Sequence, residues 1–141
     1  MLVTLDGSAE SREILPFAKA LAGAAAARMT LLRVIPPHFP LSSPFTSHSA
    51  HEFLGLEEEV TASREDLEKE ASVLREEGFS VDVATVSGVH APDGILEFAS
   101  GNQVDLIAMA THGRGGVARL ILGSVADKVI RGGNVPVLLH R

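Results

Sequence analysis

Glycines near the end of the chain have the type and spacing of a phosphate-binding site. The stretch ATHGRGGVARLILGS, residues 110–124, holds three glycines, then the apolar piece VARLIL, then Gly123–Ser124. Glycine lets backbone N–H groups approach a ligand without a Cβ in the way. A helix that begins at Ser124 would add N–H groups that lack partners inside the helix and carry partial positive charge. The pattern predicts an anion between Gly113 and Gly123, with Arg114 as a charge-assisted contact. The alternative is a tight strand-to-helix turn without a ligand, and Arg114 in a surface salt bridge.

Other polar residues are weaker candidates. Asp6 follows the first apolar run, where it would contact a nucleotide or a metal, or else cap a helix or form a turn. His112 is better explained as a hydrogen-bonding loop residue than as an acid–base catalyst. His48 and His51, near His38, offer metal ligands without acidic or thiolate partners, so chance explains them better.

The sequence lacks the residues of a specialised phosphoryl-transfer enzyme. It has no G-x-x-x-x-G-K-[ST] stretch, and so no loop lysine for β- and γ-phosphates. It has no cysteine, which excludes thiolate nucleophiles, disulfides and zinc–thiolate sites. We therefore expect no specialised enzyme, and slow hydrolysis of a bound nucleotide at most.

Composition indicates a single globular domain. The 141 residues are enough for one real core, and 45% of them are hydrophobic. The net charge of −6 and the pI near 5.4 argue against a nucleic-acid or anionic-membrane surface. No apolar run reaches the roughly 18 residues of a membrane span, and the start MLVTLDGS does not have the pattern of a signal peptide. We expect one cytoplasmic domain over residues 1–141.

Apolar strands and amphipathic helices alternate along the chain. Short apolar runs predict strands at residues 1–5, 28–35, 79–86, 104–110 and 135–140. Helical periodicity predicts helices at residues 8–27, 51–77, 91–102 and 124–133. Residues 36–50, rich in proline and serine, are expected to be a mobile loop. This alternation predicts a doubly wound α/β fold, a five-stranded parallel sheet with helices on both faces.

Individual residues mark where the helices begin and end. Ser8 and Ser124 are expected N-caps, and Gly78 is expected to end the long acidic helix. Pro16 predicts either a kink in the first helix or a regular part that begins near Arg12. The first helix is expected to bury Ile14, Phe17, Ala18 and Leu21, and the long helix to bury Leu67, Ala71 and Leu74.

The fold predicts where the candidate residues meet. In an open α/β sheet, ligands bind at the carboxyl ends of the strands, where the strand order reverses. If the strand at 1–5 is central and the strand at 104–110 is its neighbour, Asp6 and the glycine turn face one crevice. The strand at 135–140 would lie at a sheet edge, where an exposed apolar strand is usually paired or protected.

Two stretches carry a family resemblance. LVTLDGSAES near the start and THGRGGVARLILGSVADKVIRGGNVPVLLHR at the end, with matching spacing between them, are similar to the universal stress protein family over nearly the whole chain. Members of its nucleotide-binding branch carry Gly, two residues, Gly, nine residues, then Gly followed by Ser or Thr. Here this motif falls on Ala110, Gly113 and Gly123–Ser124, so alanine replaces the first glycine. Thr4 and Leu5 stand where the family often has proline before the aspartate.

The resemblance implies a ligand and a set of contacts. It implies a Rossmann-like fold of the adenine nucleotide alpha hydrolase type that binds ATP, with Mg²⁺ as an accompanying ion to be tested. Asp6 and the strand end at Val34 would border the adenosine, with Thr4 in the same site. The ribose and phosphates would be lined by Met109, Ala110, Gly113, Arg114, Gly123, Ser124, Val125 and Ala126. The resemblance also implies a homodimer in which strand 135–140 pairs antiparallel with its copy.

Ala110 leaves the strength of binding open. If the family glycine has a positive φ, alanine would cost about 1 kcal/mol, and a loss of about 1.4 kcal/mol would weaken affinity roughly tenfold. If the glycine only admits a phosphate or ribose, the extra methyl is tolerated. Three functions stay open: a nucleotide-binding regulatory or sensing protein, which we favour, a slow ATPase, and a ligand-free dimeric interaction module.

Overall fold

Five parallel strands form one sheet. The computed structural model describes residues 1–37, 50–111 and 122–141. The strands are β1 Leu2–Thr4, β2 Met29–Ile35, β3 Val81–Ser87, β4 Ile107–Ala110 and β5 Val137–His140. Their order is β3-β2-β1-β4-β5, and every neighbouring pair is parallel. The order reverses beside the central β1, with β4 as its neighbour, so the predicted doubly wound α/β fold is confirmed.

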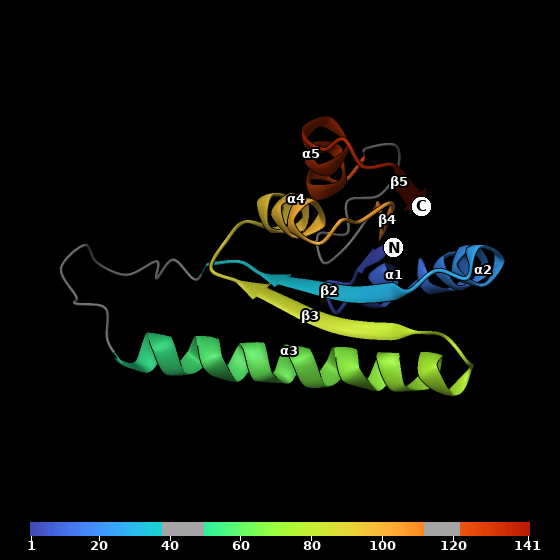
Figure 1. Cartoon of the computed structure of the whole chain (residues 1–141). Helices are drawn as coiled ribbons and strands as arrows, with labels where there is room; N and C mark the ends of the chain where they lie inside the picture. The colour runs from blue at the N-terminus through green and yellow to red at the C-terminus, as the bar shows by residue number, and fades with distance from the viewer. Residues whose placement is uncertain (38–49, 112–121) are drawn as a thin grey trace.

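Helices cover both faces of the sheet (Figure 1). They are α1 Ala9–Arg12, α2 Leu15–Ala25, α3 Ala50–Glu76, α4 Ala91–Gly101 and α5 Ser124–Gly132. In Figure 1, α3 runs along β3 and β2 on the side opposite α4 and α5. Strand side chains alternate between two cores. Val3 and Leu31 pack with α2 and α3 on what we call the α3 face, whereas Leu2 and Ile107 pack with α4 and α5 on the α5 face.

The first predicted helix is two helices. Ser8 caps α1 as predicted, because its hydroxyl accepts a hydrogen bond from the Ser11 N–H at 3.0 Å. The helix then breaks after Arg12, and α2 begins at Leu15 with Pro16 in its first turn. Proline is tolerated there because its missing N–H would have no partner in the helix. Pro16 therefore helps to start a helix, and the regular part begins three residues after the predicted Arg12.

The buried side of α2 is narrower than predicted. Ile14 and Ala18 are fully buried, as predicted, but Phe17 is 48% exposed and Leu21 is 41% exposed. Phe17 instead stacks on the ring of His140 in β5, with 4.5 Å between ring centroids. The sheet ends at β5, so this flank of α2 has no further strand to cover.

The long helix agrees with its predicted pattern. Leu67 and Ala71 are fully buried, and Leu74 is 4% exposed. Gly78 has a φ of +95° and its N–H donates to the Arg75 carbonyl oxygen at 2.9 Å, which stops the chain from continuing as a helix. α3 is thereby held along the β2–β3 half of the sheet.

Candidate functional site

The carboxyl ends of three strands bring predicted residues to one level of the sheet. β1 pairs with β2 and with β4 in registers whose continuation places Asp6 level with Val34 on one side and Thr111 on the other. Neighbouring strands lie about 4.8 Å apart. Residues that are far apart in the sequence therefore meet at the edge where an α/β sheet binds ligands.

Asp6 forms the turn between β1 and α1. Its Oδ1 accepts hydrogen bonds from the Ser8 N–H at 2.9 Å and from the Ser8 hydroxyl at 2.5 Å. Gly7, between them, has a φ of +89°, a conformation that side chains disfavour. Asp6 is therefore the turn former that the sequence allowed, and it is exposed at the carboxyl edge.

Arg33 lies against this turn and was not among the predicted residues. It belongs to β2, and only 8% of its surface is exposed. Its Nε donates to the Leu5 carbonyl oxygen at 3.1 Å, and its Nη2 donates to Asp66 Oδ2 at 2.7 Å. A Cβ on Gly7 would lie 3.2 Å from the guanidinium carbon, so the turn rests directly on this group. The sequence signal was a single arginine in the apolar run MTLLRVI.

A second arginine holds the exit of the same turn. Arg12 Nη1 donates to the carbonyl oxygens of Gly7 at 3.1 Å and Ser8 at 3.2 Å. Its Nη2 bonds Asp66 at 3.0 Å, and its Nε bonds Glu70 at 2.6 Å. The hydrogen bond from Arg33 is the main reason why the pKa of Asp66 lies below its ordinary value. Asp66 of α3 therefore binds both arginines in its charged form.

The β4–α5 connection is closed by a backbone hydrogen bond. The Gly123 N–H donates to the Thr111 carbonyl oxygen at 3.1 Å. A Cβ on Gly123 would lie 2.1 Å from that oxygen, so no other residue fits unless the backbone moves. This close approach is the physical reason for Gly123, and it fixes the start of α5 at the carboxyl end of β4.

The start of α5 corrects one prediction. Gly123 is the N-cap and Ser124 is the first helical residue, so Ser124 does not cap the helix. The first i to i−4 bond runs from the Asp127 N–H to the Gly123 carbonyl oxygen at 2.9 Å. The N–H groups of Ser124, Val125 and Ala126 precede this bond and have no partner within the helix. These are the amides that a helix offers to an anion.

The other predicted contact residues differ in how far their side chains are exposed to solvent. Strand alternation places Thr4, Val34 and Met109 on the α5 face. Met109 is 4% exposed and Ala126 is 1% exposed, so their side chains belong to the core. Any contact that these two residues make with a ligand would come from backbone atoms. Val125 is half-buried beside them.

Ala110 has ordinary strand backbone. Among the described residues that are not glycine, a positive φ occurs only at Ala26 and Gln103. Ala110 ends β4 and pairs with His140 of β5. By alternation its methyl group lies on the α3 face, like the side chain of Ala108, whereas α5 covers the other face. A need for positive φ therefore does not apply at this position.

Some predicted residues lie outside the described part of the chain. They are Gly113, Arg114, His112, His38 and His48, together with residues 38–49 of the predicted mobile loop 36–50. The side chain of His51 lies outside it as well. Their predicted roles stay predictions.

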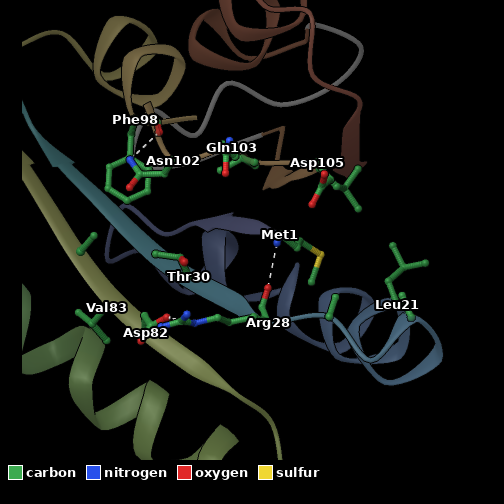
Figure 2. Close-up of a pocket in the computed structure, with 15 residues that line it drawn as sticks. Met1, Leu21, Arg28, Thr30, Asp82, Val83, Phe98, Asn102, Gln103 and Asp105 are labelled. Carbon is green, nitrogen blue, oxygen red and sulfur yellow. Dashed lines mark hydrogen bonds and ion pairs between the residues drawn. The ribbon is translucent and has the colours of Figure 1, made fainter. Parts of the chain in front are cut away.

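A hollow of about 800 Å³ lies at the amino ends of the strands (Figure 2). Its lining includes Thr30 and the ion pair of Arg28 with Asp82, and the Met1 amino group donates to the Arg28 carbonyl oxygen at 2.9 Å. None of the described site residues lines it. Because α/β sheets bind ligands at the other edge, this hollow is not the candidate site.

Two further observations apply to the described ranges only. They contain no group of three or more His, Cys, Asp or Glu side chains arranged to hold a metal ion. None of their helices combines the length and the apolar character that crossing a membrane requires.

Comparisons with known sequences agree on one family. The whole chain, residues 1–141, matches the universal stress protein family model. The universal stress protein in the QAH/OAS sulfhydrylase 3′ region of Thermus aquaticus is 35% identical over 143 residues, which cover 100% of this chain and 97% of that protein. The universal stress proteins MJ0531 of Methanocaldococcus jannaschii and Slr1230 of Synechocystis are 40% and 29% identical over 54% and 100% of this chain. The matches span only 44% and 42% of those two proteins.

Solved structures share the fold. Hypothetical protein MJ0577 is 27% identical, with a TM-score of 0.63 over 98% of this chain and 92% of that one. A universal stress protein in complex with cAMP is 23% identical, with a TM-score of 0.61 over 99% and 94% of the two chains. The universal stress protein from Archaeoglobus fulgidus in complex with dAMP is 20% identical, with a TM-score of 0.64 over 99% and 95%.

Proposed function

The chain belongs to the universal stress protein family, and from this premise we propose that it binds an adenine nucleotide as a regulatory or sensing module. Two proteins of the same fold were solved with cAMP and with dAMP, which supports adenine nucleotides as the ligand class. ATP is the nucleotide that we propose, with Mg²⁺ as an accompanying ion to be tested.

One observation carries this proposal, the hydrogen bond from the Gly123 N–H to the Thr111 carbonyl oxygen. It starts α5 at the carboxyl end of β4, one strand away from the end of β1. The first amides of α5 and the helix dipole would attract phosphates at this edge. An adenosine level with Asp6 and Val34 would then direct its phosphates toward α5.

The proposed site has two ends. In the adenosine end, which we define as Thr4, Asp6 and Val34, the Asp6 carboxylate would accept hydrogen bonds from ribose hydroxyls or the adenine amino group. The phosphate end would present the backbone N–H groups of Ser124, Val125 and Ala126, because the Gly123 N–H already bonds the Thr111 carbonyl oxygen. We define it as Met109, Ala110, Gly113, Arg114, Gly123, Ser124, Val125 and Ala126.

We propose binding rather than rapid turnover. Two described cations near this edge, Arg12 and Arg33, are bonded to Asp66 and to backbone carbonyls, so their donors are already used within the chain. The sequence also lacks a phosphate-loop lysine. A bound nucleotide would therefore not be hydrolysed rapidly, and the fraction of protein that carries it would follow the nucleotide concentration.

We also propose a homodimer through β5. This strand lies at a sheet edge, and all four of its residues are half-buried in the single chain. Half-exposed apolar edges invite pairing with another strand. Light scattering at micromolar concentration should give twice the chain mass, and a stable monomer would overturn this part of the proposal.

The function is tested by identifying what the protein carries. Freshly purified protein is denatured and the released small molecules are identified by mass spectrometry. The emptied protein is then titrated by calorimetry with AMP, ADP and ATP, with and without Mg²⁺, and with GTP as the control. We expect adenine nucleotides to bind and GTP to bind more weakly. Flat titrations would favour the ligand-free module, and hydrolysis far above the uncatalysed rate would favour an ATPase.

A further inference from the structure

We infer that Arg33 and Asp66 are positioning residues for the adenosine end, because they hold the turn from Leu5 to Ser8 in the geometry that receives the nucleotide. This inference rests on the proposed function. Neither residue belongs to the glycine motif, and neither would touch the ligand. Their effect would pass through the backbone that carries Asp6.

Arg33 is an unusual residue for its place in the core. Leu32 and Ile35 of the same strand are almost fully buried, and Arg33 itself is 8% exposed. A buried guanidinium loses free energy of hydration unless it is paired and hydrogen-bonded. Well-packed apolar residues in place of a buried ion pair are often as stable or more stable. Stability alone is therefore a weak reason for an ion pair here, which favours a role in geometry.

The contacts of Arg33 define that geometry. Its Nε bonds the carbonyl oxygen of Leu5, the residue directly before Asp6, at 3.1 Å. Its Nη2 bonds Asp66 at 2.7 Å, which fixes the plane of the guanidinium. Gly7 packs on this plane so closely that a Cβ would lie 3.2 Å from the central carbon. The turn is thus supported on both sides of Asp6.

Asp66 extends the same support to the end of the turn. Arg12, which bonds the carbonyl oxygens of Gly7 and Ser8, places its Nη2 3.2 Å and 3.0 Å from the two oxygens of the Asp66 carboxylate. Ser8 then orients Asp6 through its N–H and hydroxyl. One carboxylate on α3 therefore organises two arginines, and through them the carboxylate proposed to meet the adenosine.

The test uses two variants and a matched control. Arg33→Met removes the support and keeps an apolar filling of the core. Asp66→Asn keeps the shape but removes the charge. Arg28→Met is the control, because Arg28 forms an ion pair with Asp82 at the amino edge of the same half of the sheet. We expect the affinities for AMP and ATP to fall by the same factor, about tenfold, in the first two variants and to stay unchanged in the control.

A second readout separates positioning from general stability. We expect the Ser8 amide, which is bonded to Asp6, to exchange its hydrogen faster in Asp66→Asn by a larger factor than the Leu2 amide in the sheet core, whose exchange follows the free energy of unfolding of the whole domain. If Arg33→Met fails to fold, Asp66→Asn carries the test, since it retains an oxygen acceptor of the same shape. Equal acceleration at both amides would indicate a purely structural role and overturn the inference.

Failure of this inference is distinguishable from failure of the proposed function. If the native chain binds no adenine nucleotide, the proposed function is overturned, and the inference with it. If the native chain binds and both variants bind equally well, the inference alone is overturned. It is also overturned if only ATP is weakened while AMP is not, because the effect would then lie at the phosphate end.

Discussion

The two ends of the proposed site are held in opposite ways. At the phosphate end, a backbone N–H of Gly123 bonds a backbone carbonyl of Thr111, and the contact depends on the absence of a side chain. At the adenosine end, charged side chains of Arg33 and Arg12 hold the turn, and both are bonded to Asp66. The first arrangement is damaged by adding atoms, and the second by removing charge.

This difference predicts different sensitivities. The junction at Gly123 contains no titrating group, so its geometry should not change with pH. The turn at Asp6 depends on the ionised carboxylate of Asp66, which holds Arg12 and Arg33, so the turn should loosen in acid. One end of the proposed site should therefore be insensitive to pH, and the other should be sensitive to it.

The largest expected effect comes from Gly123→Ala. The added Cβ would lie 2.1 Å from the Thr111 carbonyl oxygen, so the hydrogen bond between the Gly123 N–H and this oxygen must break. We expect the free energy of unfolding to fall by about 3 kcal/mol, measured by urea denaturation. Gly55→Ala is the control, because a Cβ there meets nothing within 4 Å in the exposed part of α3. This variant should raise the free energy of unfolding by about 0.5–1 kcal/mol. If Gly123→Ala lowers the free energy of unfolding by no more than an ordinary surface substitution does, Gly123 does not approach the Thr111 carbonyl oxygen this closely.

Gly123 variants are therefore a poor test of ligand binding. A bulky residue there would disturb the junction whether or not a phosphate binds. Weaker binding in such a variant would follow from either cause. The ligand question needs a residue at the helix start that can change without moving the backbone.

The next effect concerns acid. Because the pKa of Asp66 is lower in the folded chain than in the unfolded one, Asp66 stabilises the fold above its unfolded pKa, and this contribution is lost as pH falls through the folded pKa. Asp66→Asn should lower the free energy of unfolding by about 1 kcal/mol at pH 7, because the Asp66 side chain is 35% exposed and solvent screens part of the interaction. The difference from the native chain should begin to shrink near the ordinary Asp pKa of about 4 and shrink further at lower pH. Urea denaturation at several pH values measures it. A difference that stays constant would contradict the assigned charge state.

Asp82→Asn gives the comparison for that experiment. Asp82 also has a pKa below its ordinary value, caused mainly by its hydrogen bond from Arg28. The side chains of Arg28 and Asp82 are 70% and 45% exposed, against 10% and 35% for the side chains of Arg33 and Asp66. Exposed ion pairs contribute little, so Asp82→Asn should show the smaller acid effect.

A third prediction separates stability from binding at the phosphate end. Ser124→Asp adds a negative charge at the first residue of α5, which should stabilise the helix by about 0.5 kcal/mol. The same charge would repel phosphates, so ATP affinity should fall roughly tenfold, and AMP affinity should fall less. Thermal unfolding and calorimetry measure the two effects. Ser72→Asp, on the exposed side of α3, makes the same charge change as a control. If Ser124→Asp binds ATP as tightly as the native chain, the phosphates do not bind at the start of α5.

The sequence predicted what depends on local pattern. The parallel sheet followed from the alternation of strands and helices, and the cap at Ser8 and the stop at Gly78 followed from residue type. The turn at Asp6 was one of the roles that the sequence left open. The cap at Gly123 could not be predicted in the same way. It depends on Thr111 approaching from another element, and nothing in the local sequence of α5 reports that distance.

The arginine network was missed for a related reason. Arg33 and Asp66 are 33 residues apart, and their partnership requires α3 to lie along β2 in one register. An arginine in an apolar run was visible, but its partner was one of many acidic residues in the long helix. Phe17 was wrongly expected to be buried because helical periodicity does not show where the sheet ends.

The smallest expected effect concerns Ala110, where the family motif has glycine. Its backbone is ordinary strand, and its methyl lies on the α3 face while the amides of α5 lie on the other. Ala110→Gly should therefore lower the free energy of unfolding by about 0.5–1 kcal/mol, the ordinary cost of glycine in a strand. ATP affinity should change by less than about twofold, measured by calorimetry beside the native chain. A tenfold gain in affinity would mean that the methyl obstructs the ligand, and the phosphate end would then depend on the first motif position as well as on the bond between residues 111 and 123.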